Sequence, residues 1–406
     1  MKVAYYSPLP PNRSGIADYG ALLLPALQER FEVVVARPGR RAPKRVDLAL
    51  YHVGNDPQAH GWIVDALRRR PGVVVLHDFV LHHLVAGLTL GRGDAEGYRV
   101  AMYRDSGVVG RLLAHGVIDR LVPALWETRA ADFPLVREIL QFAEGLIVHS
   151  SYVEERVRET GYARPIWRVP HPAWPPPQEL PPPRVAGGGA ALIGSFGYMT
   201  ASKRIPQLLE GFARLRRAFP DAALVLAGEA TPGSGITEAD GVVRLDYVAE
   251  RELWAQLDAC DVCVSLRWPT MGETSGIAIR ALSIGTPLVV SDVGWFADLP
   301  DEVAVKVPVD EREVDVLAAQ LERLVGDVGL RKRMSAAALE YVRREHDLGR
   351  VAEAYTAALE EFLGGEAVTA FVLGEIAAAA ADVGIASDAP ELADTAAAVR
   401  ETGLGH

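Results

Sequence analysis

The chain has 406 residues, which is enough for two domains, each with its own hydrophobic core. Hydrophobic residues make up 49% and charged residues 23%, as in an ordinary globular protein, and no apolar run approaches the roughly 20 residues that cross a membrane. The net charge of −11 argues against general nucleic-acid binding. With no secretory signal at the N-terminus and only two cysteines, we expect a cytoplasmic protein.

The first half of the chain predicts a parallel β-sheet with helices between its strands. Continuous apolar, β-branched runs recur there, and such runs are typical of strands that are buried on both faces of a sheet. We expect strands at residues 3–6, 32–36, 47–53, 73–77 and 145–149. The irregular segment 85–134 is expected to be helical and to shape an acceptor pocket, and a helix is expected from Phe133 to about Ala143.

Polar residues follow the first and the fourth of these strands. The first strand leads into a long loop that ends with Ser14-Gly15 at a predicted helix start, and His77 ends the very apolar fourth strand. Ligands of open α/β sheets bind at the carboxyl ends of strands, so these residues are candidate site residues. The alternative for His77 is simple packing, with Asp78 as a helix cap.

Basic residues cluster in the first half of the chain. Residues 1–180 contain 22 Lys and Arg against 19 Asp and Glu, about +3, and residues 181–406 contain 20 against 34, about −14. The clusters are Arg37, Arg40, Arg41, Lys44 and Arg45, and then Arg68, Arg69 and Arg70. They would suit peripheral contact with the anionic inner face of a membrane, although solvated charges on loops and helix ends are the commoner explanation.

A proline-rich linker separates two predicted domains. Eight of the fourteen residues from Pro170 to Pro183 are proline, and Gly187-Gly188-Gly189 follows. We therefore expect a first domain over residues 1–170, a linker over 171–190 and a second α/β domain over 191–346. Its strands are predicted at residues 191–196, 223–227, 242–245, 261–266, 288–291 and 303–307. Two such domains would form a cleft between their strand ends.

Two cations follow the first strand of the second domain. Gly197 ends that strand, and Lys203-Arg204 stand a few residues beyond it. Cations at this place are well suited to neutralise a diphosphate leaving group. The alternative, two solvated cations at a helix start, is disfavoured because positive charges oppose the helix dipole there.

The stretch Gly272-Glu273-Thr274-Ser275-Gly276 lies between a predicted strand and a predicted helix that reaches about Ile284. Free N–H groups at a helix start bind phosphate, the hydroxyls of Thr274 and Ser275 add donors, and Gly276 allows close approach of the backbone. Glu273 could accept hydrogen bonds from sugar or ribose hydroxyls. An ordinary helix N-terminus that is capped by Thr274 or Ser275 is the alternative.

No metal site is predicted. Cys260 and Cys263 lack a second cysteine pair, so we expect two buried apolar residues. His82 and His83 have no acidic neighbours in sequence that would complete a metal site.

Together these motifs resemble the retaining GT-B glycosyltransferases of family 4. In that family a glutamate begins such a turn and helix, a second glutamate lies eight positions on, and a small-Gly-Thr-Pro-Val-Val run follows, which residues 281–290 match closely. Three positions depart from the pattern. Glu273 falls one place out of register with the first glutamate. Arg280 stands where the second glutamate is expected, and could contact a phosphate or pair with Glu273 or Asp292. Tyr198 stands in the place of an arginine, for which Arg204 would substitute.

The resemblance covers about residues 1–363 and implies the GT-B fold, with two Rossmann-like doubly wound domains that face each other across a cleft. A helix at about 347–363 would pack back on the first domain, and residues 364–406 would form an Ala-rich acidic tail. The implied reaction moves a sugar from a nucleoside-diphosphate sugar to a glycan, lipid-linked or small-molecule acceptor, with retention and with neither metal nor cofactor. By resemblance, His77, Lys203, Arg204 and Glu273 would be catalytic, and the donor would be bound by Ser14, Gly15, Gly197, Tyr247, Val248, Thr274, Ser275, Gly276 and Arg280.

Two alternative functions compete with sugar transfer. A protein of this fold could bind a sugar nucleotide or glycan without transfer, but Lys203, Arg204 and Glu273 argue for catalysis. A nucleotide-sugar-modifying Rossmann enzyme would require a dinucleotide fingerprint and a Tyr-x-x-x-Lys pair placed for hydride chemistry, and the sequence has neither. The nucleotide base, the sugar and the acceptor are not predicted.

Overall fold

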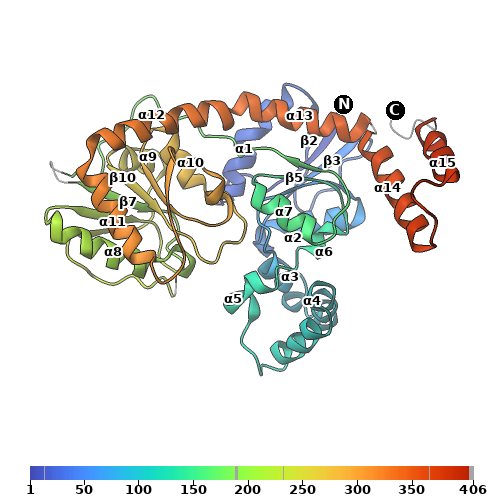
Figure 1. Cartoon of the computed structure of the whole chain (residues 1–406), viewed down its shortest axis with the longest axis horizontal. Helices are drawn as coiled ribbons and strands as arrows, with labels where there is room; N and C mark the ends of the chain where they lie inside the picture. Colours follow the sequence, from blue (N-terminus) through green and yellow to red (C-terminus); the bar gives the residue numbers. More distant parts are fainter. Residues whose placement is uncertain (13, 188–190, 232, 365, 402–406) are drawn as a thin grey trace. The chain divides into compact units, whose positions relative to one another are not determined.

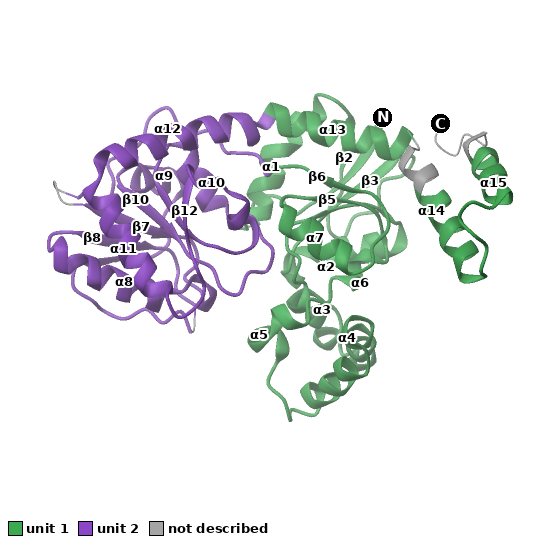
Figure 2. Cartoon of the chain, in the orientation of Figure 1, with its two compact units in different colours: residues 1–170, 349–406 green, residues 171–348 purple. Residues whose placement is uncertain are grey.

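The fold comes from a computed structural model, which describes residues 1–12, 14–187, 191–231, 233–364 and 366–401. The chain divides into two compact units, residues 1–170 with 349–406, and residues 171–348 (Figure 2). Each unit is built on a six-stranded parallel sheet with flanking helices (Figure 1). Most of the predicted glycine run and the last residues of the predicted tail (188–190 and 402–406) lie outside the described residues.

The first sheet has the strand order β2-β1-β3-β4-β5-β6, with every neighbouring pair parallel. Its strands are β1 (Lys2–Tyr6), β2 (Glu32–Val35), β3 (Leu48–Val53), β4 (Gly72–Leu76), β5 (Ala143–Val148) and β6 (Ile166–Arg168). Strands β3 and β4 are buried along their whole length, which is why their continuous apolar runs were recognisable. Strand β6 was not predicted, because it has three residues and is only partly buried.

The helices of the first unit that precede the linker are α1 (Gly15–Gln28), α2 (Pro57–Arg69), α3 (His82–Leu88), α4 (Ala95–Ile118), α5 (Leu125–Thr128), α6 (Arg137–Leu140) and α7 (Ser151–Glu159). Four of these seven named helices, α1, α2, α4 and α7, begin at a Ser or Asp side chain that caps the first turn. Helix α4 is kinked at Ser106 and Gly107. The helix expected from Phe133 to Ala143 is reduced to α6, because Leu135 has a positive φ of 53° and Ala143 already belongs to β5.

Helix α13 (Leu348–Gly364) packs on the first unit although it follows the second in sequence (Figure 1). The hydroxyls of Tyr19 and Tyr355 are 2.5 Å apart, and the Trp167 indole N–H donates to the Glu361 carboxylate at 2.9 Å. The tail continues as α14 (Glu366–Asp382) and α15 (Pro390–Glu401), and the Arg164 guanidinium lies over the Phe371 ring of α14 at 5.3 Å.

The second sheet has the order β12-β11-β10-β7-β8-β9 and is also parallel. Its strands are β7 (Leu192–Phe196), β8 (Ala223–Ala227), β9 (Val242–Leu245), β10 (Val262–Ser265), β11 (Leu288–Ser291) and β12 (Ala304–Val307). Alternate residues pack into different cores: Leu192 and Phe196 join one cluster, and Ile193 joins the other. The sheet is therefore buried on both faces, between α8 (Ile205–Ala218), α9 (Glu250–Asp258), α10 (Gly276–Ser283), α11 (Glu313–Gly326) and α12 (Val328–Glu345).

Candidate functional site

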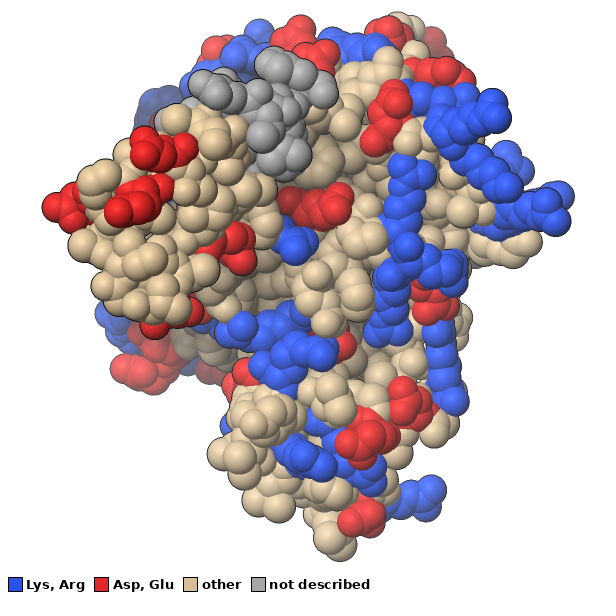
Figure 3. Space-filling view, turned by 90° about the vertical axis from the view of Figure 1, so that its right-hand side faces the viewer, with Lys and Arg blue, Asp and Glu red and all other residues tan. Residues whose placement is uncertain are grey.

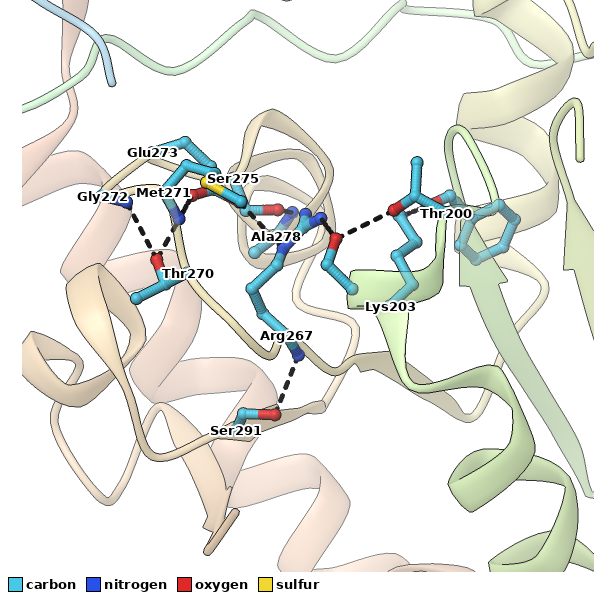
Figure 4. A network of polar contacts seen from close by, with 12 residues as sticks. Thr200, Lys203, Arg267, Thr270, Met271, Gly272, Glu273, Ser275, Ala278 and Ser291 are labelled. Carbon is cyan, nitrogen blue, oxygen red and sulfur yellow. Dashed lines mark hydrogen bonds and ion pairs between the residues drawn. The ribbon is translucent and has the colours of Figure 1, made fainter. Parts of the chain in front are cut away.

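The loop between β10 and α10 folds around the carboxylate of Glu273 (Figure 4). Its Oε2 accepts hydrogen bonds from the Met271 N–H at 2.7 Å and from the Thr270 hydroxyl at 3.2 Å. The Thr270 hydroxyl oxygen in turn accepts the N–H of Gly272 at 3.0 Å. Gly272 has a φ of +85°, a conformation that favours glycine. The Glu273 side chain remains 24% exposed, so it is fixed in place and still accessible to hydroxyls of a ligand.

Lys203 is buried at the end of a short 3₁₀ turn (Ala201–Lys203) that follows β7. Its ammonium donates to the carbonyl oxygen of Phe196, the last residue of β7. Burial, followed by the nearby positive charge of Arg267, lowers the pKa of Lys203 to about 7. Gly197 has a φ of +88°, and a Cβ at that position would lie 3.2 Å from the Lys203 Nζ, so glycine leaves room for the ammonium.

Arg267 is the charged residue of this site that was not recognised in the sequence. It lies just beyond β10, and its Nε is 3.0 Å from Oε1 of Glu273. Its backbone N–H donates to the Ser291 hydroxyl at 2.9 Å, which ties the loop to the end of β11 (Figure 4). Its position just after a predicted strand is the sequence feature by which it could have been recognised as a site residue. The site thus contains two cations, Lys203 and Arg267, and one carboxylate.

Arg204 is engaged elsewhere. Its Nε donates to both carboxylate oxygens of Glu313 at 3.1 Å, and its Nη2 also donates to this carboxylate. The Glu313 side chain is only 2% exposed at the start of α11, so the pair is largely removed from solvent. The predicted role of Arg204 at the leaving group stays a prediction, and Arg267 is the cation near Lys203. The exposed Tyr198 leaves the position of the missing arginine without a charge.

The start of α10 offers donors of two kinds. Ser275 is its N-cap, and the hydroxyl oxygen accepts the Ala278 N–H at 3.2 Å, as the capping alternative expected. The Thr274 hydroxyl is buried and has no hydrogen-bond partner within the described part of the chain. Gly276 is the first residue of α10. Space beside it is limited, because a Cβ there would lie 3.2 Å from the Trp174 ring. N–H groups of the first helical turn have no partner within the helix.

Arg280 pairs with neither Glu273 nor Asp292, which corrects two of the expected alternatives. Its Nη2 donates to Oε1 of Glu250 at 3.0 Å, and its guanidinium lies 3.7 Å from the centroid of the Trp174 ring. The residue is buried, and the ion pair with Glu250 and the aromatic ring hold its side chain in place.

Tyr247 and Val248 follow β9 at the carboxyl edge of the same sheet. Tyr247 is 63% exposed, and Val248 is half-buried against the core that includes Leu192. An exposed ring at this edge is suited to stack on a base, and that role remains a prediction.

In the first unit, buried histidines gather at the carboxyl ends of β3, β4 and β5. His52 Nδ1 and His77 Nε2 are hydrogen-bonded at 3.0 Å, the rings of His77 and His149 are 5.2 Å apart, and His60 Nδ1 bonds the His52 carbonyl at 3.1 Å. Tyr19 of α1 meets the His77 ring edge-on at 4.8 Å. Burial lowers the pKa of His52 far below its usual range and that of His60 to about 4, so both are neutral at pH 7.

Ser14 and Gly15 lie at the same edge of the first sheet as His77, after β1. The Ser14 hydroxyl caps α1 by accepting the Ala17 N–H at 3.1 Å. A Cβ on Gly15 would meet no atom within 4 Å, so the backbone there has open space for a ligand. Asp78 does not cap a helix as the alternative proposed: its carboxylate accepts the Asn55 N–H at 2.8 Å.

Residues 190–327 match the family model described as glycosyl transferases group 1. The resemblance to this family therefore extends over most of the second unit. The suspected resemblance is thereby confirmed for the unit that contains Lys203, Arg267 and Glu273. Family 4 itself stays a prediction.

Similar proteins include a glycosyltransferase and a glycogen synthase. The glycosyltransferase YqgM of Bacillus subtilis is 24% identical over 57% of this chain and 65% of its own length. A glycogen synthase of Mycobacterium tuberculosis is 27% identical over 41% of each chain. The chain thus spans about two-fifths to two-thirds of the length of these relatives.

Solved structures confirm the GT-B fold. Sucrose-phosphate synthase from Thermosynechococcus elongatus superimposes with a TM-score of 0.61 at 16% identity, over 88% of this chain and 98% of that one. Anabaena Alr3699/HepE in complex with UDP-glucose gives 0.59 at 15% identity, over 88% and 99%. At these identities the likeness shows the fold alone.

Among the described residues, no three His, Cys, Asp or Glu side chains are arranged to hold a metal ion. Cys260 and Cys263 are buried and unlinked, and His82 donates to or accepts from the Tyr98 hydroxyl at 2.8 Å. No described helix is both long and apolar enough to traverse a bilayer.

Proposed function

We propose that the protein is a glycosyltransferase that moves a sugar from a nucleoside-diphosphate sugar to a glycan, lipid-linked or small-molecule acceptor, with retention and without a metal ion. The observation that carries this proposal is the placement of Lys203 and Arg267 beside the start of α10, within the residues that match the group 1 family model. The structural neighbour HepE, whose crystals contain UDP with glucose or UDP-glucose, supports a nucleotide-sugar donor.

The main catalytic contribution would be stabilisation of the leaving group. When the bond from the sugar C1 to the diphosphate oxygen breaks, negative charge grows on the diphosphate. Lys203, Arg267, the Thr274 hydroxyl and the first-turn N–H groups of α10 would provide positive charge and hydrogen-bond donors. Because the pKa of Lys203 is about 7 before a ligand binds, an anionic diphosphate would favour its protonated form, and binding would take up a proton.

Glu273 and His77 would orient the sugar and the acceptor. The Glu273 carboxylate is held by Met271, Thr270 and Arg267, so it would present a fixed acceptor to sugar hydroxyls. His77 would serve near the reacting carbon or the acceptor, with Gly15 lining the open space beside α1. We name no enzymic nucleophile.

Donor hydrolysis without acceptor tests the proposal. A panel of UDP-, GDP-, ADP- and TDP-sugars would be offered to the wild type, to Lys203→Ala and to Lys332→Ala, an exposed lysine of α12 that serves as the control. We expect slow release of one nucleoside diphosphate that EDTA does not affect, that is lost in Lys203→Ala and kept in Lys332→Ala. Tight donor binding without turnover for any acceptor would favour the binding-only function, and no binding would refute the proposal.

Basic side chains form a band on one face of the first unit (Figure 3). Arg40, Arg41 and Lys44, between β2 and β3, are exposed and form no ion pair within the described part of the chain. We propose that this surface contacts anionic lipid peripherally at the inner face of a membrane. Co-sedimentation with phosphatidylglycerol vesicles should be lost in a triple serine variant of these residues and should be absent with phosphatidylcholine; equal binding to both lipids would disprove it.

A further inference from the structure

Arg280 is immobilised by contacts on several sides. It is 7% exposed, its guanidinium stacks on Trp174 at 3.7 Å, and Nη1 donates to the carbonyl oxygen of Gly276 at 3.3 Å. Its Nε is buried without a hydrogen-bond partner among the described residues. A cation enclosed in this way has lost most of its hydration, which is favourable only where a carboxylate and an aromatic face compensate.

The aromatic ring over Arg280 is part of the second unit. Trp174 is buried and belongs to the proline-rich segment at the start of that unit. Two hydrogen bonds fix this segment: the Ala173 N–H donates to the His346 carbonyl at 2.7 Å, and His346 Nδ1 donates to the His171 carbonyl at 2.6 Å. The Trp174 ring is therefore held in place, and it keeps the Arg280 guanidinium in one orientation.

The carboxylate partner, Glu250, is accessible. It is the first residue of α9, after the loop that carries Tyr247 and Val248, and its side chain is 57% exposed. Its Oε1 accepts from Arg280 Nη2 at 3.0 Å, and its Oε2 has no hydrogen-bond partner within the described ranges. A flexible surface glutamate is thus oriented by a rigid cation, which reduces the entropy that a ligand would lose in ordering it.

We infer that Glu250, oriented by Arg280, accepts hydrogen bonds from the vicinal hydroxyls of the donor ribose. This inference rests on the proposed function and adds a specificity-determining residue to it. A carboxylate only accepts hydrogen bonds, so it suits a diol that donates two. Arg280 bonds both Glu250 and Gly276, the residue at which α10 would meet the diphosphate, so one side chain links the two subsites. An acidic residue at the carboxyl edge of a parallel sheet binds ribose in the same manner in other nucleotide-binding folds.

The test crosses protein variants with ligand variants. Calorimetric titrations would compare UDP, GDP and ADP with their 2′-deoxy forms, for the wild type, Glu250→Ala, Arg280→Met and Glu238→Ala, an exposed loop glutamate that serves as the control. We expect the wild type to prefer the ribose form of its nucleotide by about tenfold or more, the effect of one lost charged hydrogen bond. Glu250→Ala should lose this preference because it binds the ribose form of the nucleotide more weakly and the 2′-deoxy form equally well. Arg280→Met should lose most of the preference, and Glu238→Ala should retain it.

The outcomes separate this inference from the proposed function. If the wild type binds none of the nucleotides, the proposed function fails. If it binds one but ignores the 2′-hydroxyl, or if Glu250→Ala weakens both forms equally, the ribose subsite is overturned. Thermal melting would check the folding of both variants, and the comparison of ribose with deoxyribose in the wild type tests the inference even if a variant does not fold.

Discussion

The ammonium of Lys203 donates a hydrogen bond to the carbonyl oxygen of Phe196 from a buried position. A neutral carbonyl compensates only part of the hydration that an ammonium loses on burial. Arg267 adds a second positive charge nearby, and Glu273 offsets it only in part. The pKa of Lys203 therefore falls to about 7, so the side chain gains or loses its charge near neutral pH.

Replacing Lys203 by methionine should remove a pH dependence of stability. The unfolded lysine titrates near 10.5 and the folded one at about 7, so between these values the unfolded chain binds the additional proton. The free energy of unfolding of the wild type should rise in this window, by up to about 1.4 kcal/mol per pH unit from this group. Urea unfolding from about pH 7 to pH 9 would measure the difference from Lys203→Met. Parallel curves for the two proteins would show that Lys203 is charged in the fold.

Replacing Arg204 by alanine should mainly lower stability, whereas replacing Arg267 by alanine should mainly lower the rate of donor hydrolysis. Arg204→Ala leaves the buried Glu313 unpaired and should cost about 3 kcal/mol of stability. Arg267→Ala removes a cation from the proposed leaving-group site and should lower the rate of donor hydrolysis by about 10². Denaturation and single-turnover kinetics on both variants would check this contrast. The double change Arg204→Met with Glu313→Leu should regain stability, and an unstable Arg267→Ala with an unchanged rate would contradict the assignment.

The strands could be predicted because burial on both faces of a sheet requires a continuous apolar run. Such a run can be recognised in the sequence without knowledge of the neighbouring strands. Strands β8, β9 and β11 have the predicted bounds, as their ends coincide with polar or turn residues. Strand β6 has no such run. Helix α4 was expected only as irregular helical chain, since its kink at Ser106 and Gly107 breaks the periodicity that identifies one long helix.

The polar partners of the site could not be predicted. Gly272 to Gly276 indicated a helix start at a strand end, which needs only local sequence. Arg280 with Glu250 and His52 with His77 are separated by 30 and 25 residues, so their pairing depends on the strand order of each sheet. Arg204 illustrates the same limit, because the carboxylate that pairs with it lies 109 residues away in sequence.

Buried histidines should make the protein sensitive to mild acid. Burial lowers the pKa of His60 and His82 to about 4, whereas an unfolded histidine titrates near 6.5. Between these values the unfolded state binds more protons, so stability should fall as the pH is lowered from about 6.5 to about 4. His82→Gln should reduce this loss by up to about 3 kcal/mol. Urea unfolding at several pH values would compare it with His83→Gln, an exposed neighbour for which no change is expected; a similar effect of both variants would contradict the role of burial.

Gly197→Ala should impair donor turnover through crowding at Lys203 as well as through backbone strain. An alanine at a φ of +88° costs about 1 to 2 kcal/mol, and its Cβ would lie 3.2 Å from the Lys203 Nζ. Gly39→Ala is the matched control, because Gly39 has a φ of +71° with no atom within 4 Å of the added Cβ. Both variants should lose comparable stability in denaturation, whereas only Gly197→Ala should lower donor hydrolysis, by about tenfold, for a displacement of the ammonium. Equal hydrolysis rates in the two variants would mean that the space beside Gly197 does not matter to the position of Lys203.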